Sequence, residues 1–278
     1  MFKECITSDP PRDPCFPPLA ASPTILSGGE DIFGLIYTAQ GKGPRPTMLF
    51  LHGFPGNEKN LDLVQIFRRA GFNTMFFSYR GAWGSHGSFS FSNVLEDSLA
   101  AVDFLRSDEA RTQCSVDGER IVLVGHSMGG FAAIKTAAAR PFIKETISLS
   151  GWNIGLDGKL FPEDGAAAER VRGLVDDAVP RLAGTSSEAL LREIVEKKDA
   201  FDLRDSVRSF AGRSVLLVGA AHDDAVPPET HHELLLDAFR ETEGVQAEGV
   251  MLDDDHSYSA SRVALAKVLL EYLEKRGY

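Results

Sequence analysis

The chain has 278 residues, of which 43% are hydrophobic, and this composition supplies one large core or two small ones. Its formal net charge of −11 is spread along the sequence, which argues against nucleic acid or an anionic membrane as its main partner. No apolar run approaches the roughly 18 residues of a membrane span, and charges interrupt the first 23 residues where a signal peptide is apolar. We therefore expect a cytoplasmic protein, and its oligomeric state stays open.

The three cysteines, Cys5, Cys15 and Cys114, are scattered along the chain. They have neither the spacing of a metal site nor the even number of a disulfide framework, which is typical of a reducing cytosol. A bridge between Cys5 and Cys15 within the N-terminal region stays open. We expect no cofactor and no metal ion.

The N-terminal region is predicted to be an extended arm followed by a hairpin. The first 23 residues contain six prolines, at positions 10, 11, 14, 17, 18 and 23, and prolines disfavour regular structure. Two short apolar runs follow at 24–26 and 32–39, separated by Ser27-Gly28-Gly29-Glu30. A glycine-rich turn between two such runs indicates a β-hairpin.

Continuous apolar runs then alternate with helical periodicity, which predicts a mostly parallel, twisted sheet with helices on both faces. We expect about eight strands, including the hairpin, in one α/β domain. The further strands are expected at 47–51, 73–79, 120–124, 146–150, 214–219 and 245–252. The helices are expected at 59–70, 93–106, 128–140, 228–240 and 261–275, with Asn93 or Ser92 as N-cap of the second.

The alternation stops between residues 151 and 211. Two helix-like segments occur there, at 165–182 and 185–198, and Thr185 with Glu188 fits a capping box at the start of the second. Helices inserted beside a sheet can close over a pocket and exclude water. We expect this insertion to influence the choice of substrate, the alternative being a surface excursion that contacts no substrate.

The stretch 121–130 joins a buried strand to a helix through Gly125-His126-Ser127-Met128-Gly129. A strand, a turn of small residues and a helix in this order is the context of a nucleophile elbow, in which a strained serine is presented above the sheet. The alternative is a glycine-rich turn that only lets a strand pack closely on a helix. A dinucleotide site is disfavoured because the G-x-G-x-x-G spacing is absent.

From about Ile32 to the C-terminus the chain resembles serine hydrolases of the α/β-hydrolase superfamily. The order Ser127, Asp223, His256 is the order of nucleophile, acid and base in this fold. The resemblance implies that residues 24–278 are one α/β-hydrolase domain with a helical cap at about 151–211. It also places the acid four residues before a Val-Pro, which selects Asp223 over Asp224.

The strand that ends at residue 51 continues into His52-Gly53-Phe54. In the superfamily such a His-Gly segment carries half of the oxyanion hole, so the resemblance implies backbone N–H donors at Phe54 and Met128. Gly53 and Gly56 are also explained by an ordinary turn. We interpret His52 as a structural residue.

The run from Tyr79 to Phe91 resembles esterases and peptidases related to the prolyl oligopeptidase group. This loop contains Trp83, which together with His126 and Trp152 is a candidate for lining the substrate pocket. His86 and Phe89 of the same loop are alternatives for this role, and a purely structural role of the loop stays open.

Several functions stay open from the sequence. We expect acyl hydrolysis through a serine acyl-enzyme, on a small carboxylic ester, in which His256 takes the proton of Ser127 and Asp223 orients the imidazole. The alternative is a peptidase or aminopeptidase acting on short peptides or aminoacyl amides. A metal site formed by the acidic residues and histidines at 222–224 and 253–256 would give no role to the elbow. A further alternative is a non-catalytic ligand-binding member of the fold.

Overall fold

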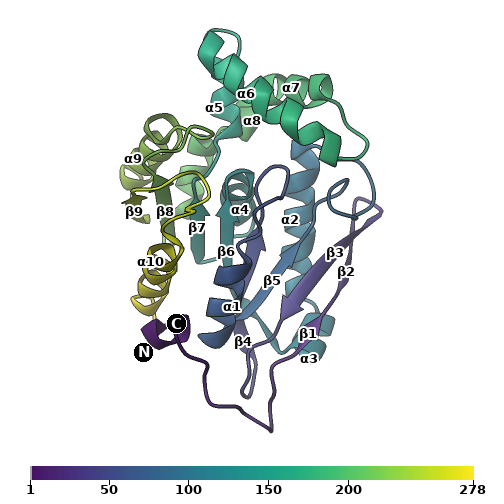
Figure 1. Cartoon of the computed structure of the whole chain (residues 1–278), viewed down its shortest axis with the longest axis vertical. Coiled ribbons are helices and arrows are strands. Elements are labelled where there is room, and N and C mark those ends of the chain that lie inside the picture. Colours follow the sequence, from purple (N-terminus) through teal and green to yellow (C-terminus); the bar gives the residue numbers. More distant parts are fainter. Residues whose placement is uncertain (1) are drawn as a thin grey trace.

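The computed structural model describes residues 2–278, and these form one nine-stranded sheet with helices on both faces (Figure 1). The strand order is β1-β3-β5-β4-β6-β7-β8-β9, and β2 pairs with β3 outside this path. The strands are β1 (Ala20–Ala21), β2 (Thr24–Ser27), β3 (Glu30–Tyr37), β4 (Arg45–Leu51), β5 (Asn73–Phe77), β6 (Val116–His126), β7 (Glu145–Leu149), β8 (Ser214–Ala220) and β9 (Gln246–Leu252).

The sheet is parallel from β5 through β9 and antiparallel at its other edge. β3 runs antiparallel to β1, β2 and β5, and Ser27 pairs with Glu30 across the turn of the β2–β3 hairpin. The turn residues Gly28 and Gly29 have φ of 58° and 84°, which glycine adopts without strain. The predicted hairpin and the mostly parallel sheet are confirmed.

The helices and helical turns connect the strands. They are η1 (Phe2–Ile6), α1 (Leu61–Arg69), α2 (Phe91–Leu105), α3 (Asp108–Cys114), α4 (Met128–Ala139), α5 (Ile154–Leu160), α6 (Gly165–Ala178), η2 (Val179–Arg181), α7 (Ser187–Glu196), α8 (Lys198–Phe201), η3 (Leu203–Phe210), η4 (Glu229–Glu233), α9 (Leu234–Arg240) and α10 (Arg262–Glu274).

The sheet separates two hydrophobic clusters, because alternate residues of its central strands point to opposite faces. Leu49 of β4 belongs to the cluster that contains α2, α4 and α9, whereas the neighbouring Phe50 belongs to the cluster of α1 and α10. Leu123 and Val124 of β6 divide in the same way. Burial on both faces explains why these strands appear in the sequence as unbroken apolar runs.

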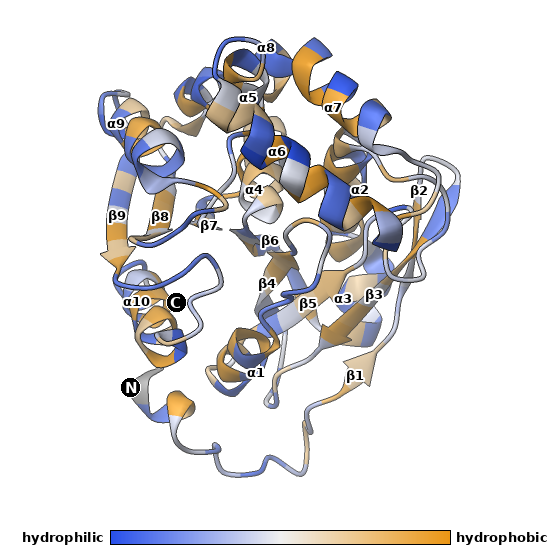
Figure 2. Cartoon of the chain, turned by 45° about the horizontal axis from the view of Figure 1, so that its top comes forward, coloured by the Kyte–Doolittle hydropathy of each residue, from blue (hydrophilic) through white to orange (hydrophobic). Residues whose placement is uncertain are grey.

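The insertion between β7 and β8 contains α5, α6, α7 and α8, which gather above one end of the central strands, at the top of Figure 1, and form the cap. The α6 helix buries Ala167, Val171, Val175 and Ala178 along one stripe, while its other side carries hydrophilic residues (Figure 2). The cap holds more helical segments than the two expected from the sequence, because α5, α8 and η3 are short and lack a long periodic pattern.

Two predicted helix caps were wrong by one or more residues. The hydroxyl of Ser90, not the side chain of Asn93 or Ser92, accepts the N–H of Asn93 at the start of α2, at 3.0 Å. In α7 the N-cap is Ser186 rather than Thr185, and its hydroxyl accepts the N–H of Ala189 at 3.2 Å. Adjacent serines and threonines are equivalent as caps, so tertiary packing selects among them.

The N-terminal arm carries two short elements, η1 and β1, and is otherwise irregular. The η1 turn precedes the first proline, so its backbone N–H groups remain to form hydrogen bonds. Within this region Cys5 is buried, Cys15 is exposed, and no disulfide joins them. No helix in residues 2–278 is long and apolar enough to cross a membrane.

Candidate active site

Ser127 occupies the sharp turn between β6 and α4. Its backbone has φ 58° and ψ −120°, a strained conformation for a non-glycine residue, and its N–H donates to the carbonyl of Leu149 at 2.9 Å. A Cβ on Gly125 would lie 1.9 Å from the carbonyl oxygen of Gly129, and a Cβ on Gly129 would lie 1.9 Å from that of Leu51. Only glycine at these two positions lets the turn close.

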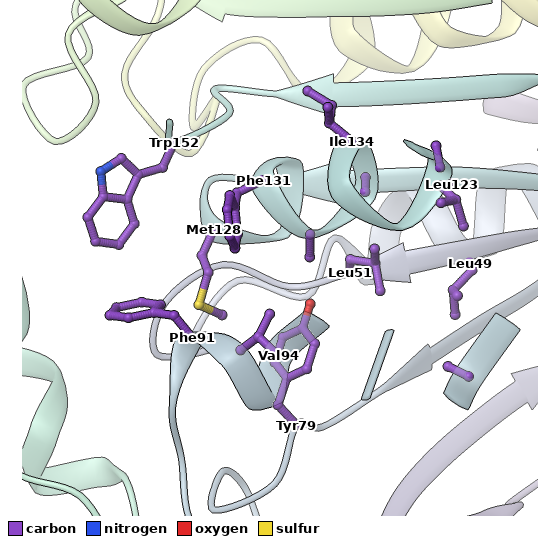
Figure 3. Close-up of a cluster of buried hydrophobic side chains, with 14 of the residues drawn as sticks. Leu49, Leu51, Tyr79, Phe91, Val94, Leu123, Met128, Phe131, Ile134 and Trp152 are labelled. Atoms are coloured by element: carbon purple, nitrogen blue, oxygen red, sulfur yellow. The ribbon is translucent and has the colours of Figure 1, made fainter. Parts of the chain in front are cut away.

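The elbow rests on a buried apolar cluster. Met128 and Phe131 of α4 are fully buried and face Phe91 and Trp152, as Figure 3 shows. Burial of these side chains is worth on the order of 1.5–3 kcal/mol each and holds the strained turn in place. The start of α4 therefore forms a rigid base beneath Ser127.

Asp223 and His256 meet from two different loops. Asp223 follows β8 and is 4% exposed, and His256 follows β9. The Nδ1 atom of His256 lies 2.7 Å from Oδ2 of Asp223, while the N–H of Val226 donates to Oδ1 of the same carboxylate at 2.7 Å. Because both of its oxygens accept hydrogen bonds, the carboxylate is held in one orientation. A carboxylate oxygen cannot donate a hydrogen bond, so Nδ1 of His256 is the protonated nitrogen. The neighbouring Asp224 is exposed and has no contact with His256 among the hydrogen bonds of residues 2–278.

The side chains of Ser127 and His256 share the same end of the sheet. Ser127 follows His126, whose ring centroid lies 4.7 Å from that of His256. Within residues 2–278 no hydrogen bond joins the Ser127 hydroxyl to the imidazole. In substrate-free enzymes such contacts are often long and shorten only in the complex with substrate.

The loop after β4 passes directly beside the elbow. A Cβ on Gly53 would lie 3.0 Å from Cβ of Ser127, so the backbone of this loop borders the nucleophile position. Neither the N–H of Phe54 nor that of Met128 donates to an acceptor within the described part of the chain. Two unsatisfied donors beside the serine provide the groups from which an oxyanion hole is built.

A cleft of about 480 Å³ lies between this loop and the cap, a volume in the range of small-molecule sites. It is lined by Phe54, Pro55 and Asn57, by residues of α6 between Glu169 and Asp177, and by Asp224 and Ala225 beside the triad acid. Other clefts lie against the N-terminal arm and contain none of the candidate site residues.

The three candidate pocket residues occupy different environments. Trp83 is 49% exposed and donates its indole N–H to the carbonyl of Pro55 at 2.8 Å, so it braces the loop at the rim of the cleft. Trp152 is 1% exposed and reaches the cleft only through its ring contact with Phe54, whose centroid lies 6.3 Å away. His126 is 4% exposed and points to the main chain of His256.

Among residues 2–278, the side chains of two other histidines form no hydrogen bond with Ser127, Asp223 or His256. His52 is buried, its Nδ1 lies 2.7 Å from the carbonyl of Gly53, and burial lowers its pKa to about 4. His222 pairs with Asp253 at the surface, with 2.7 Å between Nε2 and Oδ1. No three His, Cys, Asp or Glu side chains within residues 2–278 are grouped as metal ligands.

A buried acid in the cap, Asp157, was missed by the sequence analysis. Its carboxylate accepts the indole N–H of Trp152 at 2.6 Å and the guanidinium of Arg170 at 2.6 Å. The same guanidinium donates to the carbonyl of Ala225, two residues from the triad acid, at 2.8 Å. Arg170 thus links helix α6 to α5 and to the loop after β8. No local pattern in the sequence predicts these contacts.

Comparison with known proteins places the chain in a family. The model of the alpha/beta hydrolase family matches residues 48–273. A bis(hydroxyethyl) terephthalate hydrolase from Streptomyces coelicolor is 30% identical over 96 residues, which cover 32% of this chain and 30% of that protein. In the curated relatives most similar to the chain, the matched segment spans about a third of the relative's length.

Two solved structures share the fold along nearly the whole chain. Est1E from Butyrivibrio proteoclasticus, with ferulic acid bound, is 20% identical with a TM-score of 0.65 and covers 91% of this chain and 98% of its own. The acylaminoacyl peptidase of Pyrococcus horikoshii is 16% identical with a TM-score of 0.67. The match covers 93% of this chain and 41% of the peptidase chain. With the family model matching most of its length, the chain belongs to the alpha/beta hydrolase family.

Proposed function

We propose that this protein is a serine hydrolase that cleaves a small carboxylic ester through an acyl-enzyme. The observation that carries the proposal is the 2.7 Å contact between His256 and Asp223, formed at the same end of the sheet as the strained Ser127. Ser127, Asp223 and His256 also follow one another in the sequence in the order that this fold uses for nucleophile, acid and base. Family membership supports hydrolase activity in general.

In the proposed reaction, Ser127 attacks the ester carbonyl carbon while Nε2 of His256 takes the hydroxyl proton. Asp223 holds the Nδ1–H and stabilises the imidazolium without taking the proton. The N–H groups of Phe54 and Met128 stabilise the oxyanion, and loss of one such donor costs on the order of 10²–10³ in rate. His256 then protonates the departing alcohol, and a water molecule releases the acid by the same steps in reverse.

A small substrate is supported by the cleft between the loop after β4 and helix α6. Its volume suits a small molecule, and its lining includes the candidate oxyanion donor Phe54 and Asp224, the neighbour of Asp223. Ferulic acid, bound to the related Est1E fold, is a carboxylic acid of the kind that ester hydrolysis releases. The match to the acylaminoacyl peptidase covers 41% of that protein's length, so that comparison extends to the shared fold and not to substrate selection.

The test has two stages, labelling and substrate comparison. A fluorophosphonate probe should label the intact protein and the Ser98→Ala variant, whose hydroxyl donates to the carbonyl of Val94 within α2, but not Ser127→Ala. Equal labelling of Ser127→Ala would refute the proposal. p-Nitrophenyl acetate, butyrate and octanoate are then compared with aminoacyl p-nitroanilides, and a higher kcat/KM for the anilides would assign the protein to the peptidases instead.

A further inference from the structure

The loop that carries His256 is attached to the residue beside the nucleophile. His126 ends β6, directly before Ser127, and its Nε2 lies 2.8 Å from the main-chain carbonyl oxygen of His256. A carbonyl oxygen only accepts hydrogen bonds, so Nε2 of His126 is the donor. Since residues 126 and 127 are consecutive, this hydrogen bond links the base's main chain to the nucleophile's main chain at a fixed spacing.

The surroundings of His126 keep its imidazole neutral. Its side chain is enclosed by the ring of His256, by Tyr258 at 6.4 Å between centroids, and by the backbone of Gly53. Burial, with a smaller contribution from His256, lowers the pKa of His126 to about 3. The proton therefore stays on Nε2 at neutral pH, and Nδ1 is a bare acceptor without a partner among the described residues.

His256 is consequently held at two points by two different strands. Asp223, after β8, fixes the ring, and His126, on β6, fixes the main chain. Tyr258 secures the far side of the same loop, because its hydroxyl donates to the carbonyl of Val218 at 2.8 Å and accepts from Ser150 at 2.9 Å. Among the hydrogen bonds of the described residues, only the one from His126 joins this loop to the elbow itself.

We propose that His126 is a positioning residue, whose Nε2–H holds the His256 carbonyl so that the imidazole stays within reach of the Ser127 hydroxyl. This inference rests on the proposed serine-hydrolase function. It gives a structural reason for the histidine directly before Ser127, in place of the pocket-lining role expected from the sequence. A shift of the base by about 1 Å would cost on the order of 10²-fold in rate.

Three variants separate positioning from simple packing. In His126→Gln the side-chain amide reaches the same distance as Nε2 and keeps a donor, whereas His126→Leu fills the space without one. His232→Leu is the matched control, because His232 is also a largely buried histidine whose pKa burial lowers to about 4. Each variant is assayed for kcat and KM with p-nitrophenyl butyrate, with active sites counted by the fluorophosphonate probe and Tm measured in parallel.

We expect His126→Leu to lose on the order of 10- to 100-fold in kcat with KM nearly unchanged, and His126→Gln to recover most of that loss. His232→Leu should retain the wild-type kcat. Equal kcat values for the leucine and glutamine variants, or a lower Tm with an unchanged kcat per active site, would overturn the inference.

A wild-type protein that neither labels nor hydrolyses would refute the proposed function separately. In that case the Nε2–H proton of His126, observed by NMR, tests the hydrogen bond itself. A slowly exchanging Nε2–H resonance supports the contact, and a proton on Nδ1 contradicts it.

Discussion

Arg170 and the buried Asp157 form an ion pair within the cap, and Arg170 also joins the cap to the loop after β8 through the carbonyl of Ala225. Their 2.6 Å contact links α6 to α5, and the side chain of Asp157 has no exposed surface. Burial alone would raise the pKa of Asp157, but hydrogen bonding and charge from His231, Arg170 and Trp152 outweigh it and hold the pKa below its ordinary value. The cap is therefore held by an ion pair whose carboxylate is shielded from water, so water cannot take the place of Arg170.

Arg170→Met should destabilise the protein because it leaves a carboxylate buried without its cation. We expect the free energy of unfolding at pH 7 to fall by about 3 kcal/mol, measured by urea unfolding. Adding Asp157→Asn to this variant removes the unpaired charge and should restore part of the loss. If the single variant is as stable as the wild type, the pair does not hold the cap.

The same pair predicts a dependence of stability on pH. The folded state lowers the pKa of Asp157 from its ordinary value of 3.8. At a pH near or below 3.8, the unfolded chain therefore binds more protons than the folded protein. The pair's contribution is therefore complete above about pH 4 and is lost as the pH falls further. The difference in unfolding free energy between wild type and Arg170→Met should be constant from pH 5 to 7 and shrink in more acid buffers.

Asp223→Asn and Asp224→Asn should differ sharply in activity. Asparagine at position 223 can turn its amide N–H₂ toward His256, which stabilises the wrong tautomer and leaves Nε2 unable to accept the serine proton. We expect kcat to fall by on the order of 10³–10⁴ for Asp223→Asn and by less than about threefold for Asp224→Asn. Steady-state assays with p-nitrophenyl butyrate decide this, and a larger loss for Asp224→Asn would reverse the assignment.

Replacement by alanine should have opposite effects on stability at Gly129 of the elbow and at Gly173 of α6. Gly129→Ala places a methyl group against the Leu51 carbonyl, so we expect loss of soluble, labelled protein. Gly173 lies in mid-helix with no atom near its would-be Cβ, so Gly173→Ala should stabilise by about 1 kcal/mol through helix propensity. Thermal unfolding measures both, and a stable, labelled Gly129→Ala would contradict the turn geometry.

The cleft carries carboxylates at Glu169, Asp177 and Asp224, while its one cation, Arg170, is occupied by Asp157. Anionic acyl groups should therefore be poor substrates. Glu169→Lys should raise kcat/KM for p-nitrophenyl hydrogen succinate by about three- to tenfold and leave the neutral butyrate unchanged. Because Glu169 is exposed, the gain should disappear in 1 M salt, and a salt-independent gain would point to another cause.

The sequence predicts the central strands and the elbow well, because their signals are local. The apolar run before Ser127 and the glycines around it specify a strand, a turn and a helix without reference to the rest of the chain. The sequence did not predict the short α3 helix or the N-caps Ser90 and Ser186, since several nearby residues satisfy the same local rule. The contacts of His126 and Arg170 depend on segments more than 50 residues apart, and no periodic pattern records them.

The order of the strands gives the two halves of the candidate triad different mechanical support. Ser127 directly follows β6, which is paired on both sides, by β4 and β7, in the centre of the sheet. His256 follows β9, an edge strand paired only with β8, whose residues are mostly half-exposed. Edge strands open at lower free energy than central ones. Activity should accordingly disappear on heating before the fold does, through fraying of one edge, while the nucleophile remains in place.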